Sequence, residues 1–150
     1  MILSAQTIRA IRPVEPFIEA TKIAGMTAGL SHCGYDIRIR QNILLPPGDF
    51  SLASTIEHFD MPNDVMAQVF NKSTWARLGL HVWATILEPK WSGHLTLELA
   101  NHSHKALQIM GGSPIAQVIF HRLDASVAGY AGKYQSQPDR PVPAILERSE

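Results

Sequence analysis

Hydrophobic and polar residues recur along this chain in short runs, and these runs predict β-strands. Clusters of proline, glycine, asparagine and aspartate separate the runs, as in Pro46-Pro47-Gly48-Asp49, and such clusters form turns. Seven short strands with regular turns predict an all-β fold, a jelly roll or a β-barrel. The runs that are apolar or alternating cover residues 43–45, 50–56, 65–70, 80–87, 94–100, 106–110 and 115–120.

Both ends of the chain depart from this strand pattern. Ser4 is a favourable N-cap and Pro13 cannot continue a helix, so we expect a short N-terminal helix over residues 5–11. From Gly129 onward, glycine and proline are frequent and no hydrophobic period is visible. This composition predicts a flexible tail over residues 129–150.

Length and composition set the class of protein. With 150 residues and 45% apolar content, the chain is expected to form one domain over residues 1–150. Its 13 basic and 13 acidic residues cancel, so no bulk positive charge favours nucleic acid. Cys33 is the single cysteine, which excludes an internal disulfide and predicts a cytoplasmic location. The sequence shows neither a signal peptide nor an apolar run of membrane-spanning length, so we expect no membrane partner.

The strand at 94–100 carries the most informative carboxylate. Leu95, Leu97 and Leu99 alternate with Thr96 and Glu98, so the leucines are predicted to face the core. Alternation alone favours a solvated sheet face for Glu98. A carboxylate on the wall of a pocket could instead act as a general base.

A cluster of cations and hydroxyls precedes this strand in the segment Lys72-Ser73-Thr74-Trp75-Ala76-Arg77. Two basic side chains and two hydroxyls within six residues could bind a phosphate chain, although a solvated turn has the same composition. The segment is not a P-loop, because Phe70 and Asn71 stand where that motif needs glycine.

A protein-bound metal is not expected. A zinc-dependent nucleobase deaminase needs a Cys-x-x-Cys pair, and this chain has one cysteine. His102 and His104 are the closest pair of histidines, and they lack the helical spacing of a catalytic zinc site.

Seven segments, in order along the chain, resemble the dCTP deaminase branch of the trimeric dUTPase-like superfamily. The resemblance covers most of the chain, and the shared order of the segments makes it specific. The segments are 29–31 with 34–36, 45–53, 72–80, 87–93, 96–98 with Asn101, 115–117 and 132–137.

This resemblance implies a distorted jelly roll of the dUTPase-like type that forms a homotrimer with active sites at subunit interfaces. It implies a hydrolase acting on a cyclic amidine C–N bond, which deaminates dCTP to dUTP and ammonia in pyrimidine deoxynucleotide metabolism. The nucleotide would bind as its Mg²⁺ complex, and no zinc would take part. Residues from 129 onward would include a flap that closes over the triphosphate.

The resemblance also assigns roles to residues. Glu98 matches the catalytic glutamate, which takes a proton from water and delivers it toward the leaving ammonia. Ser73 and Arg77 match residues that place the water and stabilise the catalytic arrangement. The residues expected to bind the substrate are Lys72, Thr74, Thr85, Thr96, Gln117, Tyr130, Lys133 and Gln137.

Two other functions stay open at this stage. A dUTPase, or a bifunctional enzyme that makes dUMP from dCTP, would need an acidic residue near the Glu88 turn to orient water toward the α-phosphate. A non-catalytic nucleotide-binding regulatory trimer is the third reading. Trp83 and Ile86 lie in the stretch that lines the base pocket in the family, so a preference for a modified base or for a nucleoside monophosphate also stays open. Inhibition by dTTP stays open as well.

Overall fold

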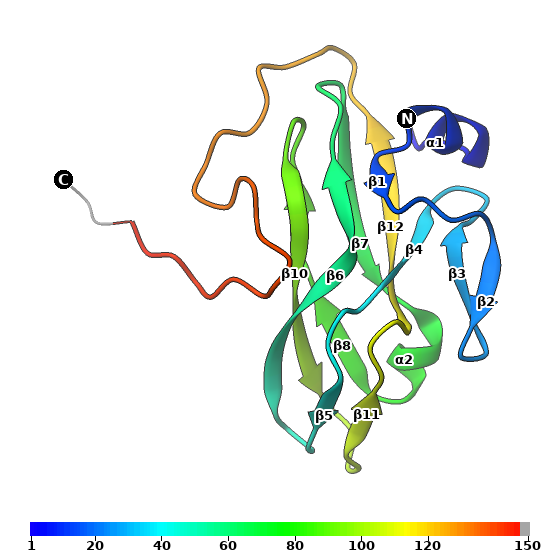
Figure 1. Ribbon diagram of the computed structural model, residues 1–150, viewed down its shortest axis with the longest axis vertical. Coiled ribbons are helices and arrows are strands. Elements are labelled where there is room, and N and C mark those ends of the chain that lie inside the picture. Colours follow the sequence, from blue (N-terminus) through cyan, green and yellow to red (C-terminus); the bar gives the residue numbers. More distant parts are fainter. Residues whose placement is uncertain (148–150) are drawn as a thin grey trace.

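The computed structural model describes residues 1–147 as a stack of antiparallel strands with two short helices (Figure 1). The helices are α1 (Ala5–Ile11) and α2 (Ser73–Arg77). The strands are β1 (Val14–Glu15), β2 (Thr21–Ile23), β3 (Met26–Leu30), β4 (Tyr35–Arg38), β5 (Ile43–Leu45), β6 (Phe50–Asp60), β7 (Val65–Asn71), β8 (Leu80–Trp83), β9 (Ile86–Leu87), β10 (Ser92–Asn101), β11 (Leu107–Ile109) and β12 (Pro114–Arg122). Within residues 1–147, no helix has the length and apolar character that crossing a membrane requires.

Two larger sheets enclose the core. One has the strand order β1-β6-β10-β8 and the other the order β2-β3-β4-β12-β7-β9, while β5 and β11 pair at one end of the molecule (Figure 1). A single cluster of buried side chains joins both sheets, with Phe59 and Leu97 from the first and Ile37, Val118 and Phe120 from the second, all fully buried. The predicted all-β architecture is confirmed.

Hydrophobic patterning located most elements correctly. The predicted helix at 5–11 matches α1, with Ser4 in the N-cap position, although its side chain makes no capping hydrogen bond. Each of the seven predicted runs falls on a strand. The run at 80–87 was wrong as a single strand, because β8 belongs to the four-stranded sheet and β9 to the six-stranded sheet. Ala84 and Thr85 lie where the chain crosses between the two sheets.

The sequence reading missed β1 to β4 and α2. These strands are two to five residues long and contain too few alternating positions to stand out. Gly29 in β3 shows how tightly this region packs, since its φ is +77° and a Cβ would lie 2.6 Å from the carbonyl oxygen of Glu19. Helix α2 has only five residues, fewer than a hydrophobic period can reveal.

The C-terminal segment lies along β10 (Figure 1). Gln137 forms a parallel bridge with Gly93, and the backbone N–H of His94 donates to the carbonyl oxygen of Gln137 at 3.0 Å. The indole Nε1 of Trp91 donates to the carbonyl oxygen of Tyr134 at 2.7 Å. Ser136 and Gln137 therefore pair with the start of β10, beyond the part of that strand that pairs with β8. The flexibility expected from residue 129 onward stays a prediction.

Candidate active site

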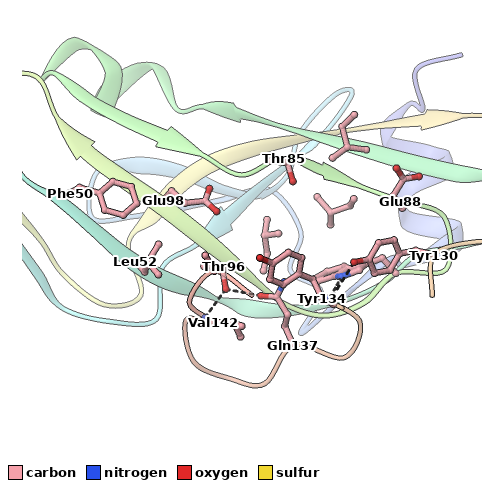
Figure 2. A pocket seen from close by; sticks show the side chains of 15 residues that line it. Phe50, Leu52, Thr85, Glu88, Thr96, Glu98, Tyr130, Tyr134, Gln137 and Val142 are labelled. Atoms are coloured by element: carbon pink, nitrogen blue, oxygen red, sulfur yellow. Dashed lines mark hydrogen bonds between the residues drawn. The ribbon is translucent and has the colours of Figure 1, made fainter. Parts of the chain in front are cut away.

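A pocket of about 800 Å³ opens between β10, the crossing from β8 to β9, and the C-terminal segment (Figure 2). Thr96 and Glu98 line it from β10, and Thr85 lines it from the crossing. Tyr130 and Gln137 line it from the C-terminal segment. Five of the residues predicted from sequence for the site are therefore brought together in one chain.

Strand β10 aims Glu98 into this pocket. Leu97 and Leu99 on either side of it are fully buried, so alternation turns Glu98 to the opposite face, as the sequence predicted. Its strand neighbours are Leu52 on β6 and Trp83 on β8. The side chain consequently stands on a pocket wall, and the solvated outer face that alternation alone favoured is not its environment.

The environment of the Glu98 carboxyl is apolar enough to change its chemistry. The residue is half-buried, and among the described residues its Oε2 atom is buried without any hydrogen-bond partner. Burial raises the pKa of Glu98 above its ordinary value of 4.5, because the charged form loses hydration. An unpartnered carboxylate with a raised pKa is suited to bind and deprotonate a water molecule.

An irregularity in the sheet explains why the neighbouring Thr96 is buried. The register of β10 against β6 shifts between His94 and Thr96, and there the hydroxyl of Thr55 accepts a hydrogen bond from the backbone N–H of Leu95 at 2.9 Å. As a result Leu95, Thr96 and Leu97 are all buried in succession. Sheet irregularities of this kind are common beside active sites, where they redirect a side chain.

The hydroxyl of Thr96 joins β10 to the C-terminal segment. It donates to Oε1 of Gln137 at 2.6 Å and accepts from the backbone N–H of Val142 at 3.0 Å (Figure 2). Both bonds come from residues beyond position 136, so this threonine fixes the segment that covers the pocket. The predicted site residues Thr96 and Gln137 thus contact each other directly.

Two aromatic residues that sequence reasoning did not single out complete this wall. Trp91 and Tyr134 line the pocket. The hydroxyl of Tyr130 accepts from the backbone N–H of Tyr134 at 3.1 Å, and the backbone N–H of Tyr130 donates to the carbonyl oxygen of Pro89 at 2.7 Å. Both missed residues fall inside segments that carry the family resemblance, which was the only available signal for them.

A charged contact also holds the C-terminal segment. Asp139 forms an ion pair with Arg40, and its Oδ1 lies 3.8 Å from Nδ1 of His94. The ring of His94 packs edge-on against His58, with centroids 5.2 Å apart. The sequence did not indicate this contact, because Arg40 and Asp139 are far apart along the chain.

The remaining predicted residues lie outside the pocket of their own chain. Ser73, Thr74 and Arg77 are exposed on α2, and Lys133 is exposed with its Nζ donating to the carbonyl oxygen of Ile145 at 2.6 Å. Gln117 donates to the hydroxyl of Ser31 at 3.3 Å.

Lys72 is buried rather than presented to a ligand. Its Nζ lies 3.1 Å from Oδ1 of Asp36 and 2.8 Å from the hydroxyl of Thr27. The phosphate-binding role predicted for Lys72 therefore has no support from its position, and it stays a prediction.

The charges of the pocket are uneven. Its lining includes two carboxylates, Glu98 and Glu88, and no lysine or arginine. Across the described residues, no group of three or more His, Cys, Asp or Glu side chains is placed to hold a metal ion. Trp83 and Ile86 differ in position. Ile86 lines this pocket, while Trp83 packs against His81 at a tilt of 38° and borders a smaller hollow next to the pocket.

Known proteins resemble this chain over most of its length. A family described as dCTP deaminase-like matches residues 35–123. The dCTP deaminase of Campylobacter lari is 35% identical, over 89% of this chain and 90% of that protein. The dCTP deaminase of Paramagnetospirillum magneticum is 33% identical, over 88% and 90%.

Solved structures share the fold at low sequence identity. The 2′-deoxycytidine 5′-triphosphate deaminase from Agrobacterium tumefaciens superposes with a TM-score of 0.66 and 16% identity, over 81% of this chain and 48% of that one. EIAV dUTPase superposes with a TM-score of 0.58 and 17% identity, over 81% and 97%.

Proposed function

The chain belongs to the dCTP deaminase-like family, and from this premise we propose that it hydrolyses the 4-amino group of dCTP. One dCTP and one water would give dUTP and ammonia. The observation that carries this proposal is the Glu98 carboxyl, half-buried in a pocket of about 800 Å³ with one oxygen free of any partner among the described residues. The relatives that carry the name dCTP deaminase match nearly the whole chain.

The chemistry requires one group that first accepts and then donates a proton. Glu98 as a carboxylate would take a proton from water while the water oxygen attacks carbon 4 of cytosine. The same group would then deliver this proton to the exocyclic nitrogen, so that the C–N bond breaks and ammonia leaves. The remaining proton of the attacking water would pass from the C4 hydroxyl to ring N3, which gives the uracil base. Burial raises the pKa of Glu98, which makes the protonated form accessible during turnover.

A second copy of the chain would complete the site. The pocket lining contains no lysine or arginine, yet a triphosphate with its Mg²⁺ keeps net negative charge. Ser73, Thr74 and Arg77 are exposed on α2 and do not line this pocket of their own chain. In the proposed homotrimer they would enter the neighbour's pocket, where Ser73 and Arg77 place the water and Thr74 contacts phosphate. Gln117 and Lys133 would add contacts to the nucleotide.

The C-terminal segment would act as the cover of the bound nucleotide. Tyr130 and Gln137 already line the pocket, and Gln137 is tied to Thr96. A closed cover excludes water other than the one that reacts, which protects a triphosphate from side reactions.

One observation favours a second activity. Glu88 lines the same pocket as Glu98 and comes from the turn where a dUTP-hydrolysing enzyme needs an acidic residue. A bifunctional enzyme would deaminate with Glu98 and then use Glu88 to direct water at the α-phosphate, giving dUMP and pyrophosphate.

Product analysis separates these functions. The purified protein is incubated with dCTP and Mg²⁺, and the products are resolved by ion-exchange chromatography. A dUTP peak establishes the deaminase, and a dUMP peak establishes the bifunctional enzyme. Unchanged dCTP, together with measurable binding, would leave the nucleotide-binding role and overturn the proposal.

Mixed trimers test the shared site. Glu98→Gln and Arg77→Ala are each expected to be inactive, and the two are denatured together and refolded at equal amounts. If each site draws Glu98 and α2 from different subunits, about a quarter of the sites regain both intact groups. Activity that stays at the level of the separate variants would show that the site is not shared in this way.

A further inference from the structure

A buried ion pair lies directly under α2, away from the pocket. Lys72 immediately precedes the helix and is 7% exposed, while Asp36 on β4 is 3% exposed. Lys72 Nζ lies 3.1 Å from Asp36 Oδ1 and donates to the hydroxyl of Thr27 at 2.8 Å. That hydroxyl in turn donates to Asp36 Oδ2 at 2.8 Å. The three side chains close a triangle that joins β3, β4 and the start of α2.

Within this triangle, Asp36 neutralises the charge of Lys72, and Asp36 and Thr27 are the partners of its ammonium group. The ammonium has an anion on one side and a hydroxyl acceptor on another, and the residue is nearly inaccessible. A buried charge persists only while it is paired and hydrogen-bonded. Removing Asp36 would leave Lys72 buried without an anion, so the segment carrying Lys72 would have to move outward.

The helix depends on such anchors because it is very short. Five residues cannot form a stable helix in water without tertiary contacts. Trp75 provides the second anchor, since its Nε1 donates to the carbonyl oxygen of Pro114 at 2.8 Å. With Lys72 and Trp75 directed inward, Ser73 and Arg77 are left exposed on the outer side.

We propose that Asp36 is a positioning residue, which fixes α2 through the buried ion pair with Lys72 and thereby places Ser73 and Arg77. This inference rests on the proposed function, in which those two exposed residues complete a neighbouring pocket. It makes Lys72 an anchor of the helix instead of a phosphate ligand. Asp36 does not line the pocket, and its carboxylate is occupied by Lys72 and Thr27.

Asp36→Asn tests the proposal with a change of charge at constant shape. Displacement of a catalytic group by about 1 Å can lower a rate by up to about 100-fold, so we expect kcat for dCTP to fall about 10- to 100-fold. Refolded at equal amounts with Glu98→Gln, the Asp36→Asn protein should regain wild-type turnover at about a quarter of the sites, those that combine its own intact Glu98 with the α2 of a Glu98→Gln subunit. No such recovery would show that Asp36 acts on the pocket of its own subunit and would overturn the proposal.

The pair of substitutions Asp36→Asn and Lys72→Met separates an anchor from a phosphate ligand. It removes both charges together and leaves no buried ion. If Lys72 only anchors the helix, KM for dCTP in the double variant should stay within about threefold of KM in Asp36→Asn alone. A further tenfold rise in KM with unchanged kcat would show direct binding of phosphate by Lys72, which would overturn the proposal.

A milder variant covers the case in which Asp36→Asn does not fold. Thr27→Val opens the triangle while keeping both charges, and Thr21→Val on the neighbouring β2 is its matched control, since the Thr21 hydroxyl takes no part in the triangle. Thr27→Val should lower kcat about threefold or more, and Thr21→Val should not. Equal kcat in the two variants would contradict the proposal that this triangle anchors α2.

Hydrogen exchange distinguishes a failure of this inference from a failure of the proposed function. In wild type the backbone N–H of Ala76 donates to the carbonyl oxygen of Lys72 at 3.0 Å. The Thr27→Val protein should exchange the amides of residues 76–79 about tenfold faster, with the amides of β12 unchanged. This result is expected whatever the nucleotide chemistry, and unchanged exchange would overturn the anchor even in an active enzyme.

Discussion

Replacing the pocket carboxylate, Glu98→Gln, is the most direct perturbation of the proposed mechanism. The amide has the shape of the carboxyl but cannot accept a proton at neutral pH. Because Glu98 Oε2 makes no hydrogen bond to the described residues, the substitution breaks no hydrogen bond at that oxygen. Any loss of activity therefore reports on the lost proton acceptor more than on altered packing.

The size of the loss follows from the chemistry and the burial. General acid–base catalysis contributes about 10²- to 10⁴-fold, and here one group serves both as base and as acid. We expect kcat to fall at least about 10³-fold, which corresponds to about 4 kcal/mol of activation free energy. Affinity for dCTP should change by less than about fivefold, since the proposed role lies in the chemical step.

Stability should change in the opposite direction to activity. Burial raises the pKa of Glu98, so the folded state gains stability below the ordinary value of 4.5 and loses it as pH rises through the raised pKa. A neutral glutamine does not pay this desolvation penalty. The variant should therefore melt at or a few degrees above the wild-type temperature at pH 8, with the difference vanishing below about pH 4.5.

The assay measures dUTP formation from dCTP and Mg²⁺ across pH, with Glu88→Gln as the matched control. Glu88 is the second carboxylate of the same pocket, so the control removes an equal charge. We expect Glu88→Gln to keep deamination within about fivefold. Wild-type kcat/KM should rise with pH through the raised pKa of Glu98, placing the acidic limb above 4.5. Deamination by Glu98→Gln within tenfold of wild type, or a limb at or below 4.5, would refute the reasoning.

Three further substitutions test the contacts around the pocket. Asn101→Ala removes a buried amide that hydrogen-bonds two backbone carbonyls and the following turn, so the free energy of unfolding should fall by about 2–4 kcal/mol in denaturant titrations. Thr96→Val removes the hydroxyl that binds Gln137, and should raise KM for dCTP about tenfold while speeding proteolysis of the C-terminal segment. Asp139→Asn breaks the exposed ion pair with Arg40 and should raise KM by about twofold to threefold, less so at high salt.

Each of these has an outcome that would contradict it. Unchanged stability in Asn101→Ala would show that the buried amide is replaceable by water. A lower kcat with normal KM in Thr96→Val would place that hydroxyl in the chemical step rather than in closure. An Asp139→Asn effect that persists at 1 M salt would mean that the ion pair is not what holds the segment.

The strands were predictable where burial alternates strongly. Leu95, Leu97 and Leu99 are all buried in the structure, and the same alternation correctly turned Glu98 to the opposite face. The pattern failed at 80–87 because an apolar run does not record which sheet its residues belong to. Ala84 is buried like a strand residue even though the chain there passes from one sheet to the other.

Parts of the site depend on contacts that no local pattern contains. Lys72 reads as a free cation in the sequence, and only the fold shows that Asp36, from a distant strand, neutralises it. In the same way, the sequence presents Asp139 only as a polar residue in a proline-rich tail, and the fold shows that it forms an ion pair with Arg40. Charge pairing across strands follows from topology, so composition and periodicity could not supply it.

Within one chain, Glu98 and Arg77 lie in different parts of the fold, and this separation affects the pKa of Glu98. A cation near Glu98 would stabilise its charged form and lower its pKa, whereas the pocket lining as it stands contains no lysine or arginine. The exposed guanidinium of Arg77 lies on α2, in a different part of the chain. In the proposed trimer, the neighbour's Arg77 would offset part of this rise, so the pKa of Glu98 would fall from its value in the isolated subunit and stay above 4.5, where the acidic limb of kcat/KM is expected. This arrangement puts a half-buried acid and the cation that would place its water on separate parts of the fold, and it would bring them together only at the proposed interface.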